Sequence, residues 1–229
     1  MPIIAEAKAS VPPMDNGTYF GRCYQMIELG TQTETFEEKE QTKKKVLLTF
    51  ELPEETYEIE LEDGTKETRI RTAQKEFALS MHKKANLRQF LQGWRGKDFT
   101  EEEAKKFDIT VLLGKFCNLS IQSNKKGYPV IMSASPLKKS EKPIDAVHKN
   151  VLLEFDNWNQ KVFESLPEYI RKKIEKSPEH TEIVAKQAKA NKPQSKNPGT
   201  DPKKQVEKVP DVEYAGNIGD EDGPSDLPF

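Results

Sequence analysis

Aromatic rings and cations alternate near the start of the chain in a pattern that could contact single-stranded nucleic acid. Phe20, Arg22 and Tyr24 share one face of a strand by period two. Single-strand binding needs positive charge for the phosphates and ring faces on which bases stack. If the intervening residues point inward, the three side chains form a stacking platform with a cation between two rings. The reverse orientation, with Phe20 and Tyr24 in the core, fits equally well, because period alone does not fix which face is buried.

Further cations lie where the walls of a binding groove are expected. Two share a strand face, five surround a predicted helix and two lie in a predicted hairpin: Arg69 and Arg71; Lys83, Lys84, Arg88, Arg95 and Lys97; and Lys125 and Lys126. We predict that these residues contact nucleic acid. The alternative is that they only balance neighbouring glutamates, which the formal net charge of −2 favours. Trp94 is assigned to the core instead, because it completes the apolar stripe of its helix.

Signatures of catalysis are missing from the sequence. It contains no phosphate-binding P-loop, no GxGxxG after a strand, no HExxH and no GxSxG. The three histidines do not cluster at ligand spacing, and the two cysteines, Cys23 and Cys117, lie far apart. Carboxylates are plentiful, but they occur in glutamate- and lysine-rich runs typical of solvated surfaces. The sequence therefore predicts a protein that is not an enzyme and needs no cofactor or metal.

The composition indicates that much of the chain cannot be buried. Hydrophobic residues make up 34% of the 229 residues and charged residues 32%, against about 45–50% and about 25% in average globular chains. No apolar stretch approaches the roughly 20 residues that span a bilayer, so no membrane partner is expected. The two isolated cysteines favour a reducing compartment. We therefore expect a cytoplasmic protein.

The expected fold is mainly β with inserted helices. Apolar alternation and turn residues predict strands over 17–29, 45–52, 56–61, 67–72, 76–81, 115–122 and 128–134. Pro53 is expected to end the second strand, and Asp63-Gly64 predicts a hairpin. Leu87, Phe90, Leu91 and Trp94 predict an amphipathic helix, and a capping box from Thr100 to Glu103 predicts a second. This order favours an OB-fold-like five-stranded barrel, with residues 14–136 as a nucleic-acid-binding domain after a flexible N-terminus, 1–13.

Beyond the barrel, a linker over 137–150 leads to a C-terminal helical arm over 151–188. Ser165 and Glu168 predict a capping box there, and Ser177-Pro178 predicts the start of a further helix. The arm is expected to pack on the barrel or on a partner chain, so a homo-oligomer is one possibility. Residues 189–229 predict a disordered tail, because they are too polar to offset their ordering entropy by burial.

Charge in the tail is sorted by sign. Residues 186–208 hold seven lysines against two acids, whereas residues 209–229 hold six acids and no base. Such charge blocks are typical of interaction tails, although a solubilising tail has the same composition. The final residues are Asp226, Leu227, Pro228 and Phe229. Solvation does not require the apolar residues that close this acidic run, so we predict that these four bind a protein partner.

The tip DEDGPSDLPF resembles the acidic tip of bacterial and phage single-stranded DNA-binding proteins, although its acids are fewer and are interrupted by Gly223, Pro224 and Ser225. The body is similar to a group of phage and prophage proteins associated with replication and recombination, over most of residues 11–179. The segments that carry this likeness are NGTYFGRCYQMIELGTQ, NLRQFLQGWRGKDFTEEEAKKFDITVLLGKFCNLSI and FESLPEYIRKKIEKSPE. The resemblance implies that Phe229 enters an apolar, basic-rimmed pocket on replication or repair partners. It also implies that the acidic run competes with DNA for the basic groove.

Together these features predict a single-stranded DNA-binding protein. It would coat single-stranded DNA without sequence preference during phage DNA replication and recombination, and would recruit replication, recombination and repair proteins through its tip. The main alternative is a non-enzymatic phage structural or interaction protein that uses the barrel as a scaffold. A nuclease accessory subunit is a second alternative, although the sequence offers no specific carboxylate pair for it.

Overall fold

Five long stretches of alternating apolar residues form the central sheet in a computed structural model, which describes residues 12–36, 39–61, 63–124, 128–141 and 144–190. These strands pair antiparallel in the order β3-β2-β1-β4-β5. Their bounds are β1 (Gly17–Phe36), β2 (Lys39–Glu60), β3 (Lys66–Ala78), β4 (Phe116–Ser123) and β5 (Pro129–Ser135). A short sixth strand, β6 (Val151–Leu153), pairs parallel with β1. The prediction of a mainly β protein with inserted helices is confirmed.

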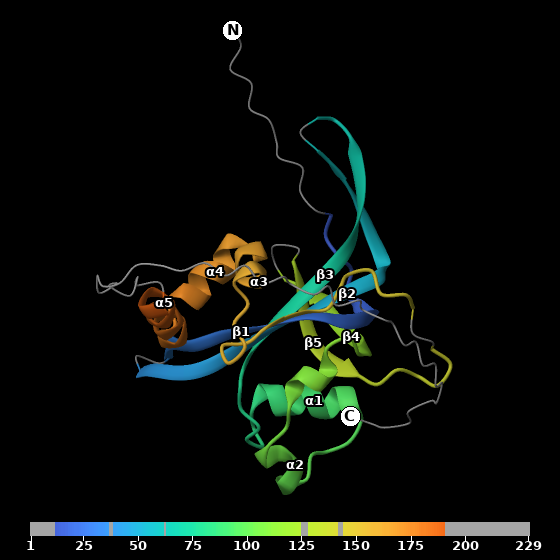
Figure 1. Cartoon of the computed structure of the whole chain (residues 1–229). Coiled ribbons are helices and arrows are strands. Elements are labelled where there is room, and N and C mark those ends of the chain that lie inside the picture. Colours follow the sequence, from blue (N-terminus) through green and yellow to red (C-terminus); the bar gives the residue numbers. More distant parts are fainter. Residues whose placement is uncertain (1–11, 37–38, 62, 125–127, 142–143, 191–229) are drawn as a thin grey trace, which may run out of the picture.

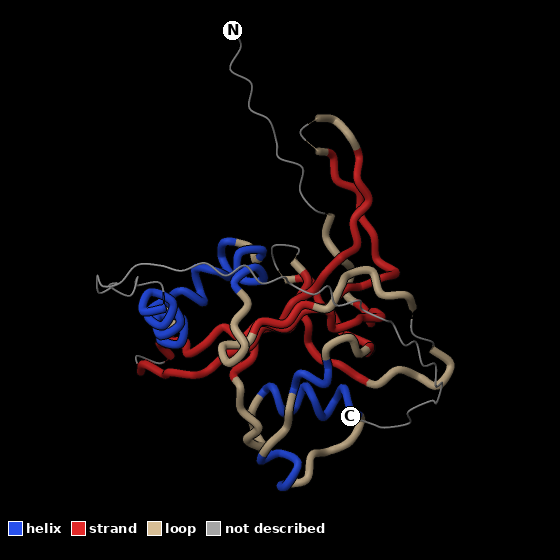
Figure 2. The backbone as a smooth tube through the Cα atoms, in the orientation of Figure 1, coloured by secondary structure: helices blue, strands red, loops and turns tan. Residues whose placement is uncertain are grey.

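The helices form two groups on different sides of this sheet (Figure 1, Figure 2). The first group lies between β3 and β4 in the chain: α1 (Asn86–Arg95), α2 (Glu101–Lys105) and a single 3-10 turn, η1 (Ile109–Leu112). The second group follows β6: α3 (Gln160–Ser165), α4 (Glu168–Glu175) and α5 (Pro178–Ala190). The β2–β3 hairpin projects from the body at the top of Figure 1.

The main core lies between the inner face of the sheet and α1. Phe50 contributes from β2, and its ring packs 5.5 Å from that of Trp94. Leu119 and Ile121 of β4 are buried in the same cluster. Trp94 is 1% exposed, and its Nε1 donates a hydrogen bond to the carbonyl of Phe116 at 3.0 Å. Its predicted place in the core is confirmed.

A second core lies on the outer face of β1 and β2, under the C-terminal helices. Ile27, Leu29 and Leu47 of the sheet are buried there against apolar residues of the arm: Leu153, Phe163, Leu166, Ile170 and Ile174. β1 buries side chains on both faces because a core covers each of them. Register shifts between Cys23 and Gln25 and between Glu28 and Gly30 change which residues point to each face. Of the two arrangements expected for the arm, packing on its own sheet is the observed one.

Gly30 marks the point where α5 meets the sheet. Its φ of +73° is in the left-handed region, and a Cβ there would lie 2.6 Å from Cβ of Ser177. Next to it, Glu179 Oε2 accepts a hydrogen bond from the backbone N–H of Thr31 at 2.9 Å. The predicted helix start at Ser177-Pro178 is confirmed, with Ser177 Oγ accepting from the N–H of His180 at 3.2 Å. A side chain at position 30 would therefore push α5 off the sheet.

Several expectations for single elements are wrong. Pro53 does not end a strand: β2 continues to Glu60, with a register irregularity between Leu52 and Thr56 that accommodates the missing N–H. The arm begins with strand β6 rather than with a helix. Ser165 does not cap α4; it ends α3, and its hydroxyl donates to the carbonyl of Val162 at 2.7 Å.

The sheet is open, and its two edges approach each other without a shared backbone ladder among the described residues. Lys75 of β3 bridges this gap, because its Nζ donates to the carbonyls of Ile131 at 2.6 Å and Met132 at 3.2 Å. Burial lowers the pKa of Lys75. The described strands therefore form one open six-stranded sheet whose edges meet through a side chain, and closure of the predicted OB-fold-like five-stranded barrel is not shown.

Ile174→Ala tests the packing of the arm on the sheet. Ile174 is fully buried in the second core, so its truncation is expected to lower the free energy of unfolding by about 2–5 kcal/mol, measured by urea denaturation. Val184→Ala is the control, because Val184 is about half exposed on α5 and its loss is expected to cost less than about 0.5 kcal/mol. Equal effects of the two substitutions would contradict packing of α4 on the sheet.

Candidate nucleic-acid interface

Arg22 lies on the outer face of β1, as one of the two predicted orientations requires, but its charge is not available to a ligand. Its Nη1 lies 2.8 Å from Oε1 of Glu51, and the two side chains are 8% and 0% exposed. The same Nη1 donates to the carbonyl of His148 at 3.0 Å, and Nη2 donates to Oδ1 of Asn150. The predicted cation between two rings is therefore part of a buried structural network.

The partners of this network belong to a strap, residues 144–150, that crosses the outer face of β1 and β2. Oε2 of Glu51 accepts from the backbone N–H of His148 at 2.7 Å and lies 2.6 Å from its ring Nδ1. The imidazole stacks on the ring of Tyr24, with centroids 4.6 Å apart. Tyr24 is half-buried under the strap, so its ring packs within the protein rather than facing a ligand.

The carboxylate of Glu51 is charged at neutral pH despite its burial. Burial alone raises the pKa of Glu51, but hydrogen bonds from Arg22 and from the backbone and ring of His148 outweigh it and hold the pKa below its ordinary value of 4.5. The linker predicted over 137–150 is thus anchored at its C-terminal end by hydrogen bonds of His148 and Asn150 to the Arg22–Glu51 pair of the sheet.

Two more predicted cations, Arg88 and Arg95, also serve inside the fold. Arg88 is 4% exposed, and its two terminal nitrogens donate to the carbonyls of Met81 and Phe99. Arg95 packs 4.7 Å from the ring centroid of Phe99 and pairs with Glu103. Both residues connect α1 to the segment that carries α2, which removes them from the surface where the walls of a groove were predicted.

Arg69 and Arg71 lie on one face of the projecting hairpin, as the strand period predicts. Arg69 is opposite Tyr57 in the β2–β3 register, and its Nη2 lies 2.8 Å from Oε2 of Glu67. Arg71 Cζ lies 5.2 Å from the ring centroid of Tyr57, and its Nη1 donates to the carbonyl of Pro12 at 2.9 Å. Their contact with nucleic acid stays a prediction.

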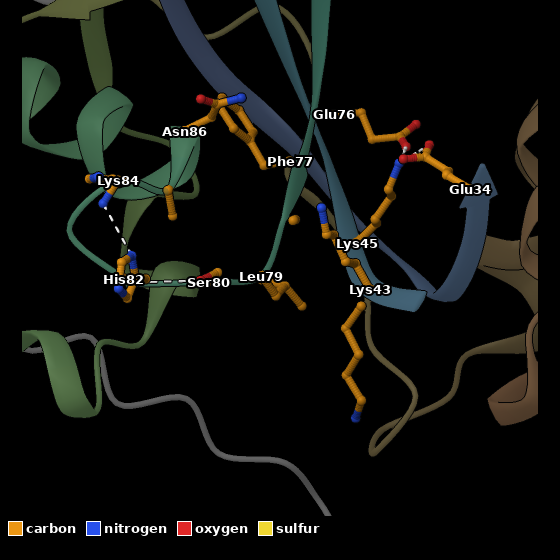
Figure 3. A pocket seen from close by; sticks show the side chains of 13 residues that line it. Glu34, Lys43, Lys45, Glu76, Phe77, Leu79, Ser80, His82, Lys84 and Asn86 are labelled. Atoms are coloured by element: carbon orange, nitrogen blue, oxygen red, sulfur yellow. Dashed lines mark hydrogen bonds and ion pairs between the residues drawn. The ribbon is translucent and has the colours of Figure 1, made fainter. Parts of the chain in front are cut away.

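Lys84 lines a cleft of about 650 Å³ between the start of β2, the end of β3 and the loop before α1 (Figure 3). Lys45 points at the carboxylates of Glu34 and Glu76 there, and these hydrogen bonds raise its pKa although burial opposes the shift. Lys43 and Lys44 are exposed at the same cleft. Lys83 lies nearby on the loop, with its Nζ 3.3 Å from Oε1 of Glu101.

The outer face of β1, β4 and β5 beyond the strap is not covered by a helix within the described residues. We call it the open face. Its residues are all uncharged and are exposed or half-buried: Thr18, Phe20, Ser120, Gln122, Tyr128, Val130, Ser133 and Ser135. Tyr128 is 65% exposed. Of the three residues of the predicted platform, Phe20 alone belongs to this surface.

Lysines surround the foot of the open face. Lys115 directly precedes β4, and Lys138 and Lys139 follow β5; all three are exposed. Lys97 is exposed directly after Gly96, which lies against Pro136, and its contact with nucleic acid stays a prediction. Lys125 and Lys126 lie between β4 and β5 in the sequence. These two residues lie outside the described residues, as do Asp226, Leu227, Pro228 and Phe229 of the tip.

The open face includes residues that the sequence prediction missed. Tyr128 and Val130 alternate with the buried Ile131 on the other face of β5, and this period-two pattern is visible in the sequence YPVI. The run Lys43-Lys44-Lys45 is equally visible. Neither pattern by itself shows whether a helix covers the face on which these residues lie.

Other kinds of site find little support in the described part of the chain. Histidine, cysteine and acidic side chains form no group of three or more there that could hold a metal ion. None of the described helices has the length and apolar character needed to cross a membrane. Comparison of the chain with protein-family models, with curated proteins and with solved structures gives no match. The site is therefore judged on its geometry.

Glu51→Gln tests the buried anchor of the strap. The substitution leaves Arg22 without its counter-charge and is expected to lower the free energy of unfolding by about 3–5 kcal/mol at neutral pH. Because the folded pKa of Glu51 lies below 4.5, this stabilisation is complete above pH 4.5 and is lost as the pH falls through the folded pKa.

Urea denaturation of both proteins from neutral to acid pH measures the difference. Glu67→Gln is the matched control, because Glu67 forms an exposed pair with Arg69 and is expected to change stability little. A Glu51→Gln protein as stable as the control at neutral pH would contradict the anchoring role of this pair.

Proposed function

We propose that the protein binds single-stranded DNA on the open face and acts as a non-enzymatic single-strand-binding protein in replication or recombination. The observation that carries the proposal is the open face itself: a three-stranded surface whose own outward side chains are uncharged, with rings at Phe20 and Tyr128 and lysines near its foot. The strands of this face direct no charged side chain outward, although the chain has 38 acidic residues. Such a surface suits a ligand with apolar base faces and an anionic backbone.

The two parts of the ligand would use different groups. Bases stack on Phe20 and Tyr128, as they do on ring platforms of other single-strand binders. Phosphates pair with the lysines around the foot of the face, which releases counterions and makes the affinity fall with salt. Arg22 and Tyr24 support this surface from below the strap rather than touching DNA, which revises their predicted role.

We extend the proposal to the fold. The strand order β3-β2-β1-β4-β5, with α1 between β3 and β4, matches the order of an OB-type barrel. The bridge from Lys75 to the carbonyls of β5 supports the interpretation that the two edges belong to one barrel opened at that seam. Oligonucleotide binding is a common use of this architecture.

Phe20→Ala and Tyr128→Ala test the stacking surface. Each is expected to weaken binding of a fluorescent single-stranded oligonucleotide by about 5- to 150-fold, because loss of one base–ring stack costs about 1–3 kcal/mol. Tyr169→Ala is the matched control: Tyr169 is 58% exposed on α4, away from the open face. Equal losses from all three variants, with the fold intact, would place the binding site elsewhere.

Deletion of Leu227, Pro228 and Phe229 tests the proposed partner site. The acidic residues that precede them repel DNA, and the deleted residues would supply the apolar contact to a protein partner. The truncated protein is expected to lose retention of replication and repair proteins in a pull-down while its affinity for single-stranded DNA is unchanged or higher. Unchanged retention would contradict a partner-binding role of the tip.

A further inference from the structure

A groove of about 710 Å³ lies at the foot of the open face and has a composition unlike the rest of that face. Phe20 of β1 and Asn118 of β4 line it from the sheet, and Glu54 of β2 and Glu141 of the segment after β5 line its sides. Its volume lies within the range of about 300–1,000 Å³ that accommodates small ligands. The groove thus combines one ring, one amide, two carboxylates and the ammonium of Lys138 next to a surface proposed to stack bases.

Phe20 gives the groove a stacking wall that is held in place. Its ring lies 5.1 Å from the ring of Phe116, at an interplanar angle of 31°. Two rings in contact keep each other in one orientation. A base that enters the groove from the open face can therefore stack on Phe20 without reordering it.

Glu141 is fixed beside that ring. Its Oε2 accepts from Nδ2 of Asn118 at 2.7 Å and from the backbone N–H of Lys138 at 2.8 Å. These hydrogen bonds, that from Asn118 first, lower the pKa of Glu141, so the side chain is an anion at neutral pH. Its Oε1 lies 3.8 Å from Nζ of Lys138, which is too far for a hydrogen bond. Oε1 therefore retains its capacity to accept.

The carboxylates decide which part of a nucleotide can occupy the groove. Lys138 can pair with a phosphate at the rim of the groove, but Glu54 and Glu141 repel a phosphate that lies against them. A base edge with an exocyclic amino group can instead donate to a carboxylate oxygen. Uracil and thymine present a carbonyl oxygen at the same position. That oxygen is an acceptor too, so the carboxylate repels it. The groove is thus complementary to an amino-bearing pyrimidine stacked on Phe20.

We propose that this groove is a base subsite that favours cytosine over uracil or thymine, with Glu141 as the residue that sets the preference. The inference rests on the proposed function and deepens it. Charge and stacking hold the strand without regard to sequence, and the groove adds a preference for the one base that occupies it. Glu141 acts through Oε1 as acceptor, and Asn118 acts as a positioning residue that holds the carboxylate.

The test compares oligo(dC) with oligo(dU) of equal length by fluorescence anisotropy at neutral pH, since these bases differ at the amino or carbonyl group. Wild-type protein is expected to bind oligo(dC) about fivefold more tightly, which is the lower end of one good base contact. Glu141→Gln places an amide donor where the acceptor was and is expected to bring the ratio to one or below. Glu58→Gln, on the exposed hairpin, is the control and keeps the wild-type ratio.

The outcomes separate this inference from the proposed function. If neither oligonucleotide binds, the proposed function is wrong. If both bind wild-type protein equally, the function stands and the base subsite is wrong, and this holds even where Glu141→Gln does not fold. If Glu58→Gln shifts the ratio as much as Glu141→Gln, a general charge effect explains the preference and the subsite is again overturned.

Discussion

The buried ion pair between Arg22 and Glu51 is the interaction on which the arrangement of this protein depends. A carboxylate without solvent exposure is stable only because a guanidinium and two N–H groups of His148 satisfy it. Arg22 belongs to β1, whereas the His148 groups belong to the strap, so the Glu51 carboxylate fixes where the strap crosses the sheet. Directly after the strap, β6 pairs with β1 and leads the three C-terminal helices onto β1 and β2.

This placement divides the outer face of the sheet into two parts with different roles. The part under the arm is apolar and forms the second core around Ile27 and Leu29. The open face carries uncharged side chains, and the rings of Phe20 and Tyr128 are its largest groups. A sheet face of this kind is suited to stacking of bases, and the lysines at its foot are suited to phosphates. Binding is thus proposed on the part of the outer face that the strap and the arm leave uncovered.

The sequence predicted the local elements well because their signals are local. The stripe from Leu87 to Trp94 and the capping box from Thr100 to Glu103 both appear as expected. It could not predict the role of Arg22, because period two places the residue on a face without revealing what covers that face. The same holds for Arg88 and Arg95, whose partners are carbonyls and carboxylates that meet them only after folding.

The most direct measurement is a titration of a fluorescent single-stranded oligonucleotide with the purified full-length protein at increasing salt, with duplex DNA as competitor. If the lysines and rings of the open face bind unpaired nucleotides, the complex forms at low salt. The logarithm of its binding constant then falls steeply and linearly with the logarithm of the salt concentration, and duplex DNA displaces the oligonucleotide poorly. Absence of a complex at low salt, a flat salt response, or equal displacement by duplex would contradict single-strand binding by this protein.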